Sequence, residues 1–165
     1  MNRPPKLSQL QLRVSREEKS AIRRAARRAG MDMSAYVLSR VLPAPAAAFQ
    51  AAVAALTGPG EPSFALAEIN SLLSGFTAAE LRQAVAAAPE AALPPFLAAY
   101  VAAMTETACN MRGLPVPPWT GRTEALPEPA FGSALPSLRL YLLTHSPAPF
   151  RRRNIFIDSS VGEQV

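Results

Sequence analysis

The chain has 165 residues, about half of them apolar, and a formal net charge of +5. Its one cysteine, Cys109, excludes an internal disulfide and a zinc site of paired cysteines, and we expect a reducing, cytoplasmic location. The sequence starts without an apolar signal core and lacks any run of about 18 uninterrupted apolar residues. We therefore expect no secretion signal and no membrane span.

The positive charge is concentrated at the N-terminus. Residues 1–42 hold ten Lys or Arg and three acidic residues, whereas residues 43–165 hold seven Arg and nine acidic residues. This asymmetry predicts a polyanionic partner for the N-terminal part and a different role for the remainder.

Residues 8–14, SQLQLRV, alternate between apolar and polar side chains. A period of two predicts a strand with one apolar and one polar face. The apolar face holds Leu10, Leu12 and Val14, and the polar face holds Gln9, Gln11 and Arg13.

Two helices are predicted after this strand. Ser15 and Glu18 have the spacing of a capping box, which starts a helix over about 16–29, and Gly30 ends it. The second helix begins near Met33 or Ser34 and ends before Pro43. We therefore expect a strand-helix-helix domain over residues 1–43.

Residues 44–165 are predicted to form a second, mostly helical domain, which makes the protein mainly α. The expected helices cover 45–57, 63–74, 78–88 and 95–112. A proline-rich stretch follows at 114–136, where Trp119 is expected to anchor the chain on the helices. Residues 137–144 could form a short helix or strand, and alternation after Arg153 indicates a docked strand.

No catalytic chemistry is apparent. The sequence lacks a nucleophile elbow, a phosphate-binding loop and a histidine pair, and its single histidine, His145, has no acidic or cysteine neighbour. We expect no catalytic residue, no metal ligand and no cofactor, so the protein is predicted to act through binding surfaces and not as an enzyme.

A single strand of seven residues exposes both of its edges and an apolar face. A homodimer solves both problems, because two such strands pair antiparallel and four helices cover the apolar face. The outer face of that ribbon fits the DNA major groove, where Gln pairs with adenine and Arg with guanine. Arg3 and Lys6 are expected to contact phosphates, while the arginines at 23, 24, 27 and 28 are equally consistent with backbone contacts and a solvated surface.

The segment LSQLQLRVSREEKSAIRRAARRAGMDMSAYVLSRVL resembles the ribbon-helix-helix family of DNA-binding proteins, and most closely its antitoxins with an LRVS-x-EEK start. The resemblance implies a homodimeric repressor of double-stranded DNA in which Gln9, Gln11 and Arg13 contact bases. It also implies that a phosphate binds the backbone amides near Met33, Ser34 and Ala35.

The role of the C-terminal domain stays open. An antitoxin-like autoregulator would use it to bind a toxin from a neighbouring gene, covering the toxin with Phe150, Arg151, Arg152, Arg153, Ile155 and Phe156. Alternatively, this segment completes the domain's own core, and the domain senses a ligand or builds oligomers. A third possibility is an enzyme or adaptor that uses the N-terminal domain only to dimerise.

Overall fold

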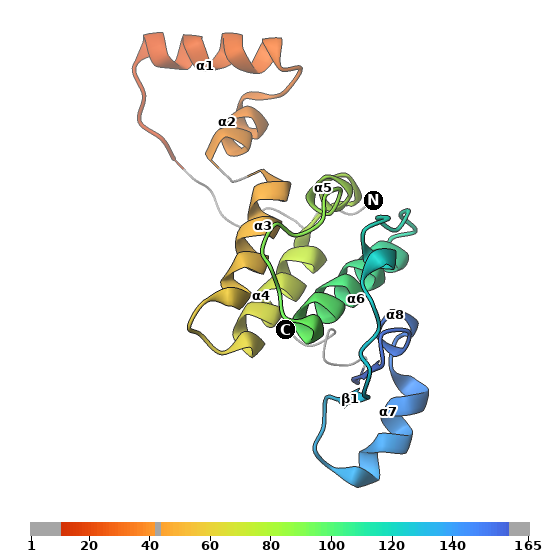
Figure 1. The fold of residues 1–165 in the computed structure, drawn as a ribbon. Coiled ribbons are helices and arrows are strands. Elements are labelled where there is room, and N and C mark those ends of the chain that lie inside the picture. Colours follow the sequence, from red (N-terminus) through yellow and green to blue (C-terminus); the bar gives the residue numbers. More distant parts are fainter. Residues whose placement is uncertain (1–10, 42–43, 159–165) are drawn as a thin grey trace. The chain divides into compact units, whose positions relative to one another are not determined.

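The computed structural model describes residues 11–41 and 44–158 and divides the chain into two compact units, Met1–Ala44 and Pro45–Val165. The described residues are predominantly helical, which confirms the mainly α prediction. Figure 1 shows the helices of both units.

The N-terminal unit contains helices α1 (Arg16–Arg28) and α2 (Met33–Val41), which pack against each other. Ser15 and Glu18 form the predicted capping box, in which the Ser15 amide donates to Glu18 Oε2 at 2.7 Å and the Glu18 amide to Ser15 Oγ at 3.2 Å. Gly30 follows α1 with a φ of +65°, a left-handed conformation that glycine adopts without strain.

The N-terminal unit has almost no interior in a single chain. Ala26 is its one buried residue among those described, and Ile22 and Val37 are only half-buried. Residues 11–14 precede α1 without strand pairing within the described chain. The apolar side chains of this unit therefore need further cover to form a stable core.

The C-terminal unit is built around α6 (Pro95–Met111). Helix α3 (Pro45–Ala54) packs on α4 (Pro62–Gly75) and α5 (Ala78–Ala84), and α4 packs on α6 (Figure 1). A 3-10 turn, η1 (Ala55–Thr57), extends α3. The core joins fully buried side chains of α3, α4, α5 and α6, including Phe49, Ile69, Leu81 and Val101. Residues 101–106 of α6 are all buried, so the middle of this helix is enclosed on all sides.

The chain after α6 wraps back onto that helix in short elements. These are η2 (Thr120–Arg122), β1 (Ala130–Phe131), η3 (Pro136–Leu138), α7 (Arg139–His145), α8 (Ala148–Arg151) and β2 (Ile155–Phe156). Strands β1 and β2 pair parallel, with Ala130 opposite Ile155 and Phe131 opposite Phe156. The predicted docked strand is thus confirmed, and residues 139–144 of the ambiguous segment lie in helix α7.

Helix α5 is shorter than predicted and ends at Ala84, not at residue 88. The carbonyl of Val85 accepts a hydrogen bond from Trp119 Nε1 at 2.9 Å, and the carbonyl of Ala88 accepts one from Gln50 Nε2 at 3.0 Å. These contacts and Pro89, which lacks an amide donor, divert the backbone from the helix. The indole contact also confirms that Trp119 anchors the proline-rich stretch.

Residues 33–57 contain an 18-residue window long and apolar enough to cross a membrane by length and composition alone. This is weak evidence, because a core helix of a water-soluble protein passes the same test. Within this segment, α3 buries Phe49 and Val53 completely in the helical core of the C-terminal unit.

Candidate nucleic-acid interface

Two of the side chains predicted to contact bases lie in the described part of the chain. Gln11 and Arg13 are exposed and immediately precede the cap of α1. Gln9, Lys6 and Arg3 lie outside the described residues, as does Leu10 of the apolar face. The position of Gln11 and Arg13 leaves both available for contact with another molecule.

The two apolar residues that alternate with them are also uncovered in a single chain. Leu12 is 59% exposed and Val14 is 44% exposed. Near the start and end of α2, Met33 and Val41 expose further apolar surface. Apolar side chains at this density are typical of a surface that another chain covers.

Helix α1 presents a dense set of cations to solvent. Arg16, Lys19, Arg23 and Arg27 are spaced by three or four residues and lie on one side of the helix, and all four are exposed. On the neighbouring side, Arg24 Nη1 donates to Ser20 Oγ at 2.8 Å. Glu17 and Glu18 lie in the first turn of α1, where the helix dipole stabilises negative charge. The remaining charged residues of α1 are all cations, so this part of the helix has a positive potential.

The hydrogen bonds with Ser15 favour the ionised form of the acidic side chain in the capping box. Hydrogen bonding from the backbone and then from the side chain of Ser15 lowers the pKa of Glu18 below its ordinary value. The cap fixes the point at which the extended residues 11–14 join α1. The segment that is predicted to contact bases is therefore attached to a defined helix end.

The amides predicted to hold a phosphate lie at the start of α2. Here Asp32 acts as the helix cap: its Oδ1 accepts from the Ala35 amide at 2.9 Å, and its carbonyl accepts from the Tyr36 amide at 2.9 Å. Met33 and Ser34 are exposed beside it. One of the three predicted amides is thus already used within the chain, and a phosphate at this position would lie next to the carboxylate of Asp32.

The six residues predicted to contact a partner protein divide into two groups. Phe150, Arg153, Ile155 and Phe156 are buried in the C-terminal unit, whereas Arg151 and Arg152 are exposed. The phenyl ring of Phe150 meets Tyr100 edge-on, with their centroids 5.1 Å apart. This burial matches the alternative in which the segment completes the core of its own unit.

Sequence reasoning missed the acidic partner of these arginines. Glu106 of α6 is buried and forms ion pairs with Arg152 and with Arg153, whose Nη2 lies 2.5 Å from Glu106 Oε1. Arg153 also donates to the carbonyls of Pro149 and Thr120. Glu106 is the only charged residue between Pro95 and Met111, and this isolation is the signal that could have identified it.

The environment of Glu106 combines opposing effects on its ionisation. Burial raises the pKa of this carboxyl, while the hydrogen bond from Arg153 and the charges of Arg153 and Arg152 lower it, and the net pKa lies below the ordinary glutamate value. The carboxylate therefore remains ionised and holds the C-terminal segment against α6.

Residues 5–53 match a family model named NikA-like and described as mobilization protein NikA. No curated protein and no solved structure matches the chain. The match includes the segment LSQLQLRVSREEKSAIRRAARRAGMDMSAYVLSRVL and extends past Ala44 into α3. The N-terminal third of this chain is thus similar to NikA-like mobilization proteins, which is consistent with the ribbon-helix-helix family but does not single out its antitoxins.

Proposed function

We propose that the protein is a homodimer that binds specific sequences of double-stranded DNA through residues 8–14. The observation that carries the proposal is the alternation at the start of the described chain. Leu12 and Val14 are exposed apolar residues, and Gln11 and Arg13 are exposed polar residues between and beside them. This pattern immediately precedes a capped, highly basic helix.

A second copy of the same segment is the cover that fits this surface. Two antiparallel copies of residues 8–14 pair their backbone edges and place Leu12 and Val14 of both chains on one face. The half-buried side chains of Ile22 and Val37 complete a shared interior with them. Such a dimer supplies the core that one N-terminal unit lacks.

The opposite face of this ribbon then presents Gln11 and Arg13 from both chains. Their side chains match the donor and acceptor patterns of adenine and guanine in the major groove. The cations of α1 and the charge excess of residues 1–42 supply the sequence-independent attraction to phosphates. The two-fold symmetry of the dimer predicts a palindromic or tandem site.

The match to a family described as mobilization protein NikA favours a role in mobilization, and for a DNA-binding chain we propose that the molecule mobilized is DNA. The alternative is the repressor expected from the resemblance to antitoxins, with a toxin partner. For that alternative, four of the six proposed partner-binding residues are buried, so only Arg151 and Arg152 offer accessible contacts. We therefore rank mobilization above toxin neutralisation.

Selection from random duplexes tests the DNA-binding proposal. The full chain is expected to enrich one short symmetric or tandem motif, and a variant with Gln9, Gln11 and Arg13 all changed to Ala is expected to lose that selection while keeping weak general binding. A variant with Arg151 and Arg152 changed to Ala serves as the control and should select as the wild type does. Unchanged selection by the triple variant would refute the proposed contact surface.

The two roles on DNA separate in cells. A mobilization protein is expected to raise the transfer frequency of DNA that carries the selected site. An autoregulating repressor is expected to lower expression from a promoter that carries that site. A toxin-neutralising protein would in addition protect cells from the product of an adjacent gene and co-purify with it.

A further inference from the structure

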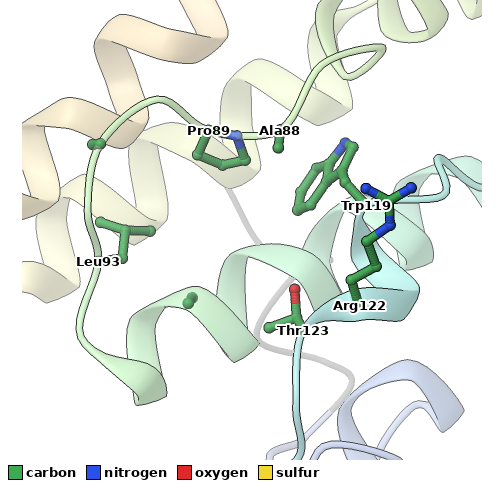
Figure 2. Close-up of a pocket in the computed structure, with 8 residues that line it drawn as sticks. Ala88, Pro89, Leu93, Trp119, Arg122 and Thr123 are labelled. Atoms are coloured by element: carbon green, nitrogen blue, oxygen red, sulfur yellow. The ribbon is translucent and has the colours of Figure 1, made fainter.

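The C-terminal unit contains a cavity of about 270 Å³ that the DNA-binding proposal does not use. It lies between the loop that follows α5 and the turn η2. In Figure 2, Trp119, Arg122 and Thr123 lie on one side of the cavity, and Pro89 and Leu93 lie on the other. We propose that this cavity binds a small organic anion with a planar apolar body, such as an aromatic carboxylate.

The walls of the cavity are held in place by long-range hydrogen bonds. On one side, the side-chain amide of Gln50 donates to the Ala88 carbonyl at 3.0 Å and accepts from the Glu90 amide at 2.9 Å, so it pins the loop at both ends of Pro89. On the other side, Trp119 Nε1 donates to the Val85 carbonyl at 2.9 Å. A cavity with fixed walls loses little conformational freedom when a ligand binds.

The turn η2 and the residue after it carry the polar groups of the cavity, and buried hydrogen bonds hold this turn in place. Thr120 of η2 is completely buried, its hydroxyl donates to the Pro117 carbonyl at 2.9 Å, and its carbonyl accepts from Arg153. The Arg122 amide donates to the Trp119 carbonyl at 3.1 Å, and the Thr123 amide to the Thr120 carbonyl at 3.2 Å. The backbone positions of Arg122 and Thr123 are therefore set by the fold.

The lining determines the chemistry of the ligand. Arg122 is exposed and forms no ion pair with any residue of the described ranges 11–41 and 44–158. A guanidinium with free donors binds a carboxylate through two parallel hydrogen bonds. Thr123 adds a hydroxyl donor at the same side of the cavity.

The remaining lining is apolar. The indole of Trp119 offers a planar surface, and Pro89, Leu93 and Ala98 add further apolar surface. An aromatic ring of the ligand would replace water on these surfaces while its carboxylate meets Arg122. A ligand without charge, or without a ring, uses only half of these contacts.

Trp119 makes the proposal directly measurable, because it is the only tryptophan of the chain. Its fluorescence and its single indole N–H resonance in nuclear magnetic resonance spectra both report on the cavity. The full chain is titrated with benzoate as the probe, with benzamide as the neutral match and acetate as the match without a ring. Benzoate is expected to shift both signals saturably, and benzamide and acetate to bind at least about tenfold more weakly.

Two variants assign the effect to the cavity. Arg122→Gln should weaken benzoate binding about tenfold or more, and Arg82→Gln, which removes an exposed arginine of α5 outside the cavity, should leave it unchanged. Circular dichroism checks that both variants are folded. The proposal is overturned if benzoate gives no saturable shift, if benzamide binds as tightly, or if Arg122→Gln binds as the wild type does. None of these outcomes depends on DNA binding.

Discussion

The carboxylate of Glu106 on α6 and the guanidinium of Arg153 form a buried ion pair across 47 residues of sequence. Both side chains are almost completely buried, at 4% and 5% exposure. Burial makes removal of one partner costly, because the other is left as an uncompensated charge. This pair therefore links the end of the chain to the centre of the C-terminal unit.

Replacing Glu106 with Gln is expected to lower the free energy of unfolding by about 3–5 kcal/mol, because Arg153 would remain buried without a counter-charge. Urea unfolding followed by circular dichroism measures this change. Arg152→Gln is the matched control: its side chain is 65% exposed, so the loss should be about 1 kcal/mol or less. Equal effects of the two variants would contradict the central role of the Arg153 pair.

The same ion pair predicts a dependence of stability on pH. The pKa of Glu106 in the folded chain lies below its ordinary value. The ionised carboxylate therefore contributes fully to folding stability above the unfolded pKa of about 4.3, and this contribution is lost as the pH falls through the lowered folded pKa. The difference in unfolding free energy between wild type and Glu106→Gln should be constant near neutral pH and shrink in acid. A difference that grows in acid would show that the sign is wrong.

Leu12→Asp is expected to prevent dimer formation, because it places unpaired carboxylates in the proposed shared core. Light scattering at micromolar concentration should report a monomer, whereas the wild type should be a dimer. Gln11→Asp adds the same charge on the opposite face and should remain dimeric. A wild-type chain that is folded and monomeric would refute the dimer.

Arg13→Ala and Lys6→Ala are expected to affect DNA binding in different ways. Arg13→Ala should cost about 1–3 kcal/mol on the selected site and relax one base position. Lys6→Ala should weaken all duplexes alike and reduce the salt dependence by about one phosphate contact. Binding isotherms at several salt concentrations distinguish the two patterns, and identical patterns would argue against separate base and phosphate contacts.

Asp32→Asn tests whether a phosphate binds at the start of α2. Asparagine keeps an oxygen that can accept from the Ala35 amide but removes the negative charge. Glu17→Gln is the control, because it changes the net charge by the same amount at an exposed site of α1. If a phosphate binds at the start of α2, Asp32→Asn should raise the affinity for all duplexes by more than Glu17→Gln does. An equal rise in both variants would place the phosphate elsewhere.

Features set by residues close in sequence were predictable. Ser15 with Glu18 forms the predicted capping box, and Gly30, which was predicted to end α1, has a positive φ. These structures depend on hydrogen bonds within one or two turns, so local sequence is sufficient to specify them.

Features that depend on distant residues were not predictable in the same way. The early end of α5 depends on Gln50 and Trp119, which approach it only in the folded chain. Arg153 looks like part of a solvated basic run, and its burial follows from Glu106. The alternation of residues 8–14 predicts two faces, but in a single described chain residues 11–14 form no strand, because the partner strand that we propose belongs to a second chain.

The position of Arg153, 47 residues after Glu106, has a consequence for the order of folding during synthesis. Residues 11–41 emerge from the ribosome long before Phe150, Arg153 and Ile155, which complete the core built on α6. Until then, Glu106 lacks its counter-charge, and part of the apolar surface of α6 remains open. In the proposed dimer, the N-terminal units of two neighbouring nascent chains would therefore pair while their C-terminal units are still incomplete.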